Sequence, residues 1–239
     1  MNISIAECGV RSAKFKGLYG PDDRPIERAP KMKSKPLTNA GENYLTEEEE
    51  KKLFKLLRNR KDWQAERDYT FLRLARATAL RRVELCRLNV GDVRGKTTLA
   101  VDERIAAKGG IGEVHLPRDK QQDIQALIRW FLRLKKQWGE ALDDDAPLFI
   151  SRKGNRMDES TVNRLLSKWC LEAGIPHYSP HAMRHTKARR ILDDSTYLNP
   201  EEQEQKLRFV NQQLRHKSWG ATMIYTRPTK EQMRNVGAI

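Results

Sequence analysis

Apolar residues recur at helical spacing along much of this chain. Between about residues 64 and 79, the positions i, i+3, i+4 and i+7 hold Phe71, Leu74, Ala75 and Thr78. Residues with this spacing share one face of a helix, which is buried when it is apolar. The spacing recurs in Ile124, Leu127, Ile128, Phe131 and Leu132, and again in Val162, Leu165, Leu166, Trp169 and Cys170. Each of these stretches is therefore predicted to be an amphipathic helix.

Start signals predict further helices. Thr46 and Glu49 have the spacing of a capping box, so a helix should begin there. Ser179-Pro180 and Asn199-Pro200 each join an N-cap residue to a proline, which favours the first helical position. These two helices should end near residues 192 and 214. A short helix should also follow Arg81, with three buried residues, Val83, Leu85 and Cys86.

The pattern changes between about residues 96 and 117. The segments 97–101 and 112–116 are typical of short strands, and Gly109 and Gly110 mark a turn between them. The predicted fold class is therefore mainly α with a small antiparallel β-sheet (α+β).

The first 45 residues differ from the rest, because they are basic and proline-rich and lack apolar periodicity. We interpret residues 1–45 as a flexible basic arm, which either contacts DNA or is a solvated tail. Residues 46–228 form the predicted folded domain. Residues 229–239 form a short C-terminal tail.

Charge and cysteine content narrow the function classes. The 239 residues include 46 Lys and Arg against 32 Asp and Glu, a net charge of +14. Such an excess favours a polyanionic partner, although ribosomal and membrane-surface proteins share it. The cysteines, Cys8, Cys86 and Cys170, lie too far apart to indicate a disulfide framework or a metal site. No apolar run or signal peptide is evident, so we expect a cytoplasmic protein without a membrane partner.

Four separated patterns contain residues suited to phosphodiester chemistry: Arg81 in a Leu-Arg-Arg-Val-Glu-Leu segment, Lys108 beside two glycines, His181 with Arg184, and His216 nine residues before Tyr225. Two arginines can clamp a phosphate bidentately, and a lysine can protonate the leaving oxygen. Histidines can hydrogen-bond the phosphate, and a tyrosine hydroxyl can attack it to form a covalent intermediate. Together these residues supply cleavage chemistry that needs no metal and no cofactor.

Each residue also has a structural explanation. His181 and Arg184 could share a helix face by chance in an arginine-rich chain. Lys108 could be a solvated turn residue, and Tyr225 a half-buried core aromatic. Glu84 could simply pair with a neighbouring arginine across a helical turn. The order and spacing of the whole set favour the functional interpretation.

These motifs resemble those of the tyrosine recombinase, or phage integrase, family. That family has a Leu-Arg-x-x-Glu-Leu box, a lysine on a β-hairpin, His-x-x-Arg-His-Thr, and a Gly-His-like box nine residues before the tyrosine. The matching segments here are 80–85, Lys108, 181–186 and 216–225. The resemblance covers about residues 45–228. The chain is similar to the short members of this family, which consist of the catalytic domain alone.

The resemblance implies a role for each matching residue. Arg81 and Arg184 would clamp the scissile phosphate, and His181 and His216 would contact it. Tyr225 would attack, and Lys108 would be the general acid, with Lys96 and Lys120 as alternatives. Glu84 would support the site from behind, and the residues assigned to DNA binding are Arg82, Arg215 and Lys217. Two positions depart from the family pattern, because Ala79 and Arg215 each stand where glycine is usual.

The resemblance also implies the activity and the partners. We expect a site-specific recombinase that cuts and rejoins DNA through a 3′-phosphotyrosine, for integration, excision or inversion of a mobile element. Its expected partners are double-stranded DNA and copies of itself, a dimer on each site and a tetramer in the synapse. By the same resemblance, the C-terminal tail, residues 229–239, either docks on a neighbouring subunit or frays. Accessory DNA-bending proteins are further candidates, and the protein would be nucleoid-associated when bound to DNA. The alternatives are a non-cleaving DNA-binding regulator and a type IB topoisomerase.

Overall fold

A computed structural model describes residues 43–107, 110–116, 124–193 and 199–226. Residues 1–42 of the N-terminal arm, including Cys8, lie outside these ranges, as do Lys108, Lys120 and the C-terminal tail. The elements, in chain order, are α1 (Glu47–Asn59), α2 (Trp63–Thr78), α3 (Arg82–Arg87), α4 (Val90–Val93), β1 (Thr98–Val101), β2 (Gly112–His115), α5 (Ile124–Gln137), α6 (Glu159–Glu172), α7 (His181–Asp193), α8 (Pro200–Leu214) and α9 (Gly220–Met223).

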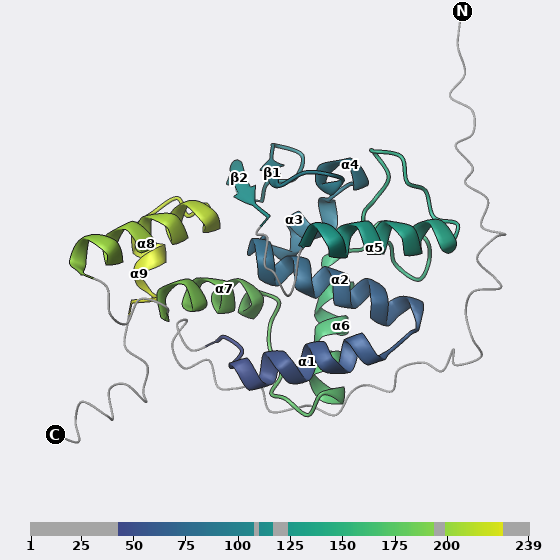
Figure 1. Ribbon diagram of the computed structural model, residues 1–239, viewed down its shortest axis with the longest axis horizontal. Helices are drawn as coiled ribbons and strands as arrows, with labels where there is room; N and C mark the ends of the chain where they lie inside the picture. The colour runs from purple at the N-terminus through teal and green to yellow at the C-terminus, as the bar shows by residue number, and fades with distance from the viewer. Residues whose placement is uncertain (1–42, 108–109, 117–123, 194–198, 227–239) are drawn as a thin grey trace, which may run out of the picture.

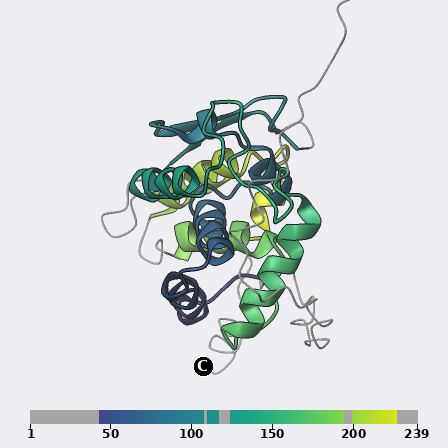
Figure 2. The ribbon, with the colours of Figure 1, turned by 90° about the vertical axis from the view of Figure 1, so that its right-hand side faces the viewer.

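The main core is built around α2, which packs against α1, α5 and α7. Figure 2 looks nearly along α1, α2 and α5, with α6 crossing beside them. The predicted buried face of α2 is confirmed, because Phe71, Leu74, Ala75 and Thr78 are all buried. Phe71 meets Phe149 edge-on, with ring centroids 5.1 Å apart. This core fixes α2 and α7 relative to each other. Arg81 follows the end of α2 by three residues, and His181 and Arg184 lie at the start of α7.

A second, smaller core lies between α7, α8 and α9, at the left of Figure 1. Its fully buried members are Ala79, Ala188, Val210, Leu214 and Tyr225. The predicted nucleophile is therefore a packing residue of this core. Because α8 starts at an Asn199 capping box and runs to Leu214, as predicted, its end falls beside α7 and the segment that follows α2.

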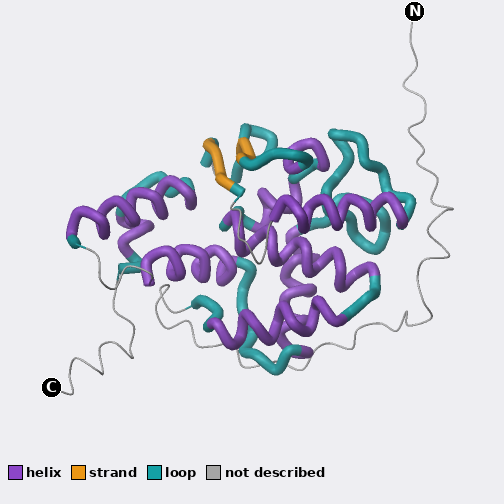
Figure 3. Tube along the Cα trace, viewed as in Figure 1, coloured by secondary structure: helices purple, strands orange, loops and turns teal. Residues whose placement is uncertain are grey.

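The two strands form an antiparallel hairpin, drawn in orange in Figure 3. Thr98 pairs with His115, and Val101 pairs with Gly112. Each strand is one residue shorter than predicted, but the small sheet and its direction are confirmed. Mainly helical structure with one antiparallel sheet is thus the observed fold class.

Several local predictions need correction. In α3 the buried residues are Glu84, Leu85 and Cys86, whereas Val83 is only half-buried. Apolar periodicity misplaced this face because the buried Glu84 is neutralised by arginines. In α5 the predicted residues Leu127 and Leu132 are also half-buried. Among the described residues, no helix is long and apolar enough to cross a membrane.

Candidate active site

Helix ends bring most of the predicted site residues together. Arg81 is the N-cap of α3, Arg184 lies in the first turn of α7, and His216 follows α8. Arg184 donates from Nη1 to the carbonyl of Ala79 at 2.7 Å, and from Nη2 to the carbonyl of Leu214. Those carbonyls lie two residues before Arg81 and two residues before His216. Arg184 therefore fixes all three segments around one point.

The site is strongly positive. Arg184 is 4% exposed, and its pKa is lowered to about 10, first by burial and then by the nearby charge of Arg81. His216 lies close enough to both guanidinium groups for their charges to act on it. A guanidinium has five N–H donors, so the two carbonyl bonds of Arg184 leave donors for a ligand. Two like charges held this close favour an anion between them.

Tyr225 is held at this point by contacts on several sides. Its hydroxyl lies 2.7 Å from Nδ1 of His185. The ring of His216 stacks on the tyrosine ring, with centroids 6.3 Å apart and planes inclined by 7°. Nη1 of Arg189 donates to the Tyr225 carbonyl at 3.2 Å. Burial raises the pKa of Tyr225 to about 12, although the charge of Arg184 acts in the opposite direction.

His216 is fixed through Thr222. Its Nδ1 lies 2.8 Å from the Thr222 hydroxyl oxygen, which also accepts from Nδ2 of Asn211 at 2.9 Å. The pKa of His216 is lowered to about 4, first by burial and then by Arg184 and Arg81. The ring is therefore neutral at pH 7, and its Nδ1 is already engaged.

Glu84 lies behind Arg81, fully buried. It accepts from the backbone N–H of Arg81 at 2.8 Å, from Nη1 of Arg81 at 2.9 Å and from Nη2 of Arg215 at 2.5 Å. Burial alone would raise its pKa, but the charge of Arg215 and these hydrogen bonds outweigh burial and hold the pKa below its usual value. Glu84 is thus an ionised anchor for both arginines.

Arg215, which the sequence assigned to DNA binding, points inward. Its residue is 7% exposed, and its Nε donates to the carbonyl of Gly110 at 2.8 Å. Nη1 of Arg215 is buried and has no hydrogen-bond partner. Arg215 therefore joins the end of α8 to the hairpin and to Glu84.

Both residues that flank the pair 108–109 hydrogen-bond to charged side chains of the site. The N–H of Ala107 lies 3.3 Å from a carboxylate oxygen of Glu84, and the Gly110 carbonyl is held by Arg215. A Cβ on Gly110 would lie only 3.0 Å from Nη1 of Arg81. Lys96, the alternative to Lys108 within the described residues, precedes β1 and so lies at the strand end remote from this turn.

The remaining predicted residues surround this centre. His181 is the exposed first residue of α7, and Lys217 is exposed beyond His216. Arg82 is half-buried, donating to Glu159 and, at 3.0 Å, to Asn163 on α6. A hollow of about 320 Å³ opens between β2 and the end of α8, with Gly110, Gly112, Arg215, His216 and Lys217 among its lining residues.

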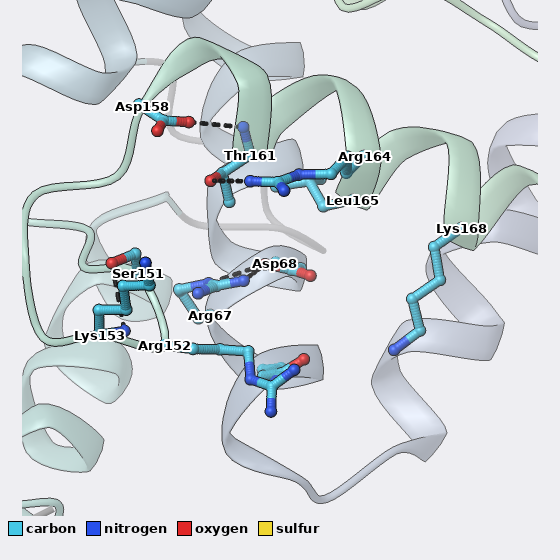
Figure 4. A pocket seen from close by; sticks show the side chains of 11 residues that line it. Arg67, Asp68, Ser151, Arg152, Lys153, Asp158, Thr161, Arg164, Leu165 and Lys168 are labelled. Carbon is cyan, nitrogen blue, oxygen red and sulfur yellow. Dashed lines mark hydrogen bonds and ion pairs between the residues drawn. The ribbon is translucent and has the colours of Figure 1, made fainter. Parts of the chain in front are cut away.

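A larger cavity of about 590 Å³ lies elsewhere, between α2, α6 and the turn at 151–153 (Figure 4). None of the predicted site residues lines it. Its floor holds the buried pair Arg67–Asp68, and Arg152, Lys153 and Lys168 make its walls basic. We attribute to these basic side chains only a contribution to the positive charge of the molecular surface.

Sequence reasoning missed three residues that hold this arrangement: His185, Arg189 and Thr222. His185 stands inside the His-x-x-Arg-His-Thr motif, so a signal for it was present. Arg189 and Thr222 carry no local signal, because each acts through contacts with residues of other segments of the chain.

Comparison with known proteins finds a family profile and several relatives. The phage integrase family profile matches residues 43–232. A tyrosine recombinase XerC of Corynebacterium efficiens is 33% identical over 172 residues, which cover 70% of this chain and 48% of that protein. The tyrosine recombinase XerA of Pyrococcus furiosus is 29% identical over 224 residues, covering 92% of this chain and 67% of the relative.

Solved structures show the same fold. A crystal structure of XerA recombinase superposes with a TM-score of 0.59 at 24% identity, covering 90% of this chain and 66% of that one. XerH site-specific recombinase bound to its difH substrate superposes with a TM-score of 0.60 at 20% identity, covering 82% of this chain and 54% of that one. The chain spans about half the length of several curated relatives that it matches. With its profile match extending over most of its residues, this chain belongs to the phage integrase family.

Proposed function

We propose that this protein cuts and rejoins DNA strands at specific sites through a covalent bond between Tyr225 and a 3′-phosphate. One observation carries the proposal: the Tyr225 hydroxyl lies 2.7 Å from Nδ1 of His185, the residue that follows Arg184 on α7. Tyr225 and Arg81 both lie within electrostatic range of the Arg184 guanidinium. A nucleophile and two phosphate-binding cations therefore share one centre. Family membership and the recombinases bound to DNA among the structural neighbours support the same activity.

In the proposed reaction, Arg81 and Arg184 neutralise the non-bridging phosphate oxygens as charge develops on them. His216 is neutral and stacked on the tyrosine, so its ring can hydrogen-bond the phosphate once DNA is bound. Lys108 protonates the leaving 5′ oxygen, and its place in the chain between Ala107 and Gly110 supports this role. Rejoining reverses these steps, because the phosphotyrosine bond retains the energy of the broken linkage.

The proposed partners follow from charge and surface. A net charge of +14 favours a polyanion, and Arg82 and Lys217 adjoin Arg81 and His216 in the chain. We propose double-stranded DNA as substrate, with a dimer on each site and a tetramer in the synapse. His181 is proposed as a further phosphate contact at the exposed start of α7.

The experiment uses supercoiled plasmid carrying the DNA that flanks the protein's own gene. The reaction is quenched with SDS, and covalent protein–DNA adducts are collected and mapped. Tyr225→Phe should abolish the adduct, whereas Tyr69→Phe should not, because Tyr69 lies in the main core against Phe54 and Trp130. DNA binding without an adduct would favour the non-cleaving regulator instead.

A further inference from the structure

The side chain of His185 is in hydrogen-bond contact with the Tyr225 hydroxyl. It follows Arg184 on α7, and its ring lies 5.4 Å from the tyrosine ring, tilted by 51°. The tilt lets Nδ1 approach the hydroxyl at 2.7 Å, within the range of a strong O–H hydrogen bond. A group within this distance of an attacking oxygen meets the geometric requirement for a general base.

His216 is arranged differently, although it also contacts the tyrosine. Its ring plane is nearly parallel to that of the phenol ring, and the two ring centroids lie 6.3 Å apart. Its Nδ1 is already engaged with Thr222. His181 stands four residues before His185, at the exposed start of α7. Of these three histidines, His185 is the one placed to receive the tyrosine proton.

The protonation states agree with this geometry. Burial, followed by the charges of His181 and Arg184, lowers the pKa of His185 to about 4. The ring is therefore neutral at pH 7, and with its proton on Nε2 it presents a lone pair on Nδ1. Tyr225 is a phenol at this pH, because burial raises its pKa to about 12. Since the phenol holds its proton so firmly, transfer before attack would be uphill.

We propose that His185 orients the Tyr225 hydroxyl through Nδ1 and accepts its proton as the phenol oxygen attacks the scissile phosphate. In this step the O–P bond to tyrosine forms, the P–O5′ bond breaks, and the tyrosine proton moves to Nδ1. The 5′ oxygen leaves with a proton from the general acid, proposed above as Lys108. Rejoining returns the His185 proton to the departing phenol. The inference rests on the proposed function, because it requires Tyr225 to be the nucleophile.

The test compares two reactions at the same site, one in which Tyr225 attacks the phosphate and one in which a DNA strand attacks it without the tyrosine. The first substrate is a nicked duplex spanning the cleavage position mapped in the plasmid experiment, from which the short 5′-hydroxyl strand is lost after cleavage. The second carries a 3′-p-nitrophenyl phosphate, which an incoming 5′-hydroxyl strand displaces. Its nitrophenolate leaving group needs no proton, and Tyr225 takes no part in the reaction. The variants are His185→Ala, His185→Gln and, as a matched control, His115→Ala on the exposed face of β2.

Adduct formation should fall about 100-fold in both His185 variants, in line with the loss of a general base. Displacement of nitrophenolate should be unchanged in both, and His115→Ala should match the wild type in both reactions. An equal loss in the two reactions would overturn the inference, because it would mean that His185 supports the phosphate clamp or the fold. If His185→Gln formed the adduct as fast as the wild type, the proton transfer to His185 would be overturned. Only a hydrogen bond that positions the tyrosine hydroxyl would then be left as its role.

The two proposals can fail separately. If the wild-type protein forms no adduct at Tyr225, the proposed function fails, and the role of His185 fails with it. If the wild type forms the adduct and His185→Ala forms it equally fast, only the role of His185 is lost.

Discussion

The ion pair between Arg215 and Glu84 is buried deeply enough for its contribution to stability to be worked out from its contacts. The two side chains are 4% and 0% exposed. Removing one partner of a buried pair costs roughly 3–5 kcal/mol, and losing the bond from Nε to the Gly110 carbonyl adds about 1 kcal/mol. Against this, Nη1 of Arg215 is buried without a partner, and its removal relieves about 1–3 kcal/mol. Arg215→Met should therefore lower the free energy of unfolding by about 3 kcal/mol.

Urea unfolding followed by far-UV circular dichroism measures this difference. Arg208→Met is the matched control, because Arg208 lies on the same helix and pairs with Glu204 one turn away at 71% and 57% exposure. Exposed pairs of this kind contribute less than about 0.5 kcal/mol. The slope of unfolding free energy against urea should be similar in both variants, so that the midpoints report stability alone.

A double-mutant cycle with Glu84→Leu decides whether the cost belongs to the pair. Glu84→Leu leaves Arg215 buried and unpaired, so it should also be costly. With both partners replaced, the penalty should be smaller than the sum of the single penalties by about 2–3 kcal/mol. The reasoning is refuted if Arg215→Met is no more costly than Arg208→Met, or if the single penalties simply add.

Three further predictions concern the same centre. The protein should lose stability as the pH falls from about 6.5 toward 4: the unfolded chain then protonates histidines that stay neutral in the fold, since His185 and His216 have pKa values of about 4. When the free energy of unfolding, measured with urea, is plotted against pH, its slope should reach up to about 2.7 kcal/mol per pH unit for two such groups. Replacing both histidines by glutamine should flatten this curve. A wild-type curve that is flat between pH 7 and 5 would contradict the prediction. Gly110→Ala should slow adduct formation about 10-fold by displacing the Arg81 guanidinium, whereas Gly220→Ala, with open space around it, should not; equal rates would argue against this close approach. Thr222→Val keeps the shape of the side chain but frees Nδ1 of His216, so adduct formation should fall while Thr98→Val on β1 leaves it unchanged; an unaffected rate would show that Thr222 does not orient the histidine.

Helix periodicity and helix-start signals predicted most of the fold correctly, because these are local effects. The capping boxes at Thr46 and Asn199 are present, and the buried face of α6 is the predicted one. Apolar periodicity was wrong at α3, because the carboxylate of Glu84 is buried there while the apolar Val83 is only half-buried. Burial of Glu84 depends on Arg215, which lies 131 residues further along the chain. No local pattern can contain that information.

The candidate site was predictable as a set of residues but not as a set of contacts. Motif order identified Arg81, Arg184, His216 and Tyr225, which the structure brings together. It could not show that His185 would meet the tyrosine, since that contact depends on the angle between α7 and the segment after α8. Nor could it show which way Arg215 points, because a basic side chain near a phosphate site is expected to face solvent.

The two departures from the family's glycines share one physical explanation. Ala79 and Arg215 have φ angles of 55° and 50°, and among the described residues they are the non-glycine residues with positive φ. Each caps the C-terminus of a helix, where a left-handed residue turns the chain and glycine is favoured. The carbonyls at these two turns, Ala79 and Leu214, both accept from Arg184. Arg184 therefore lies between the negative ends of α2 and α8, which stabilise its charge in a buried position. A non-glycine residue in this conformation costs of order 1–3 kcal/mol. At position 215 the ion pair with Glu84 offsets that cost. Arginine is therefore tolerated in a backbone conformation that favours the glycine usual at this position.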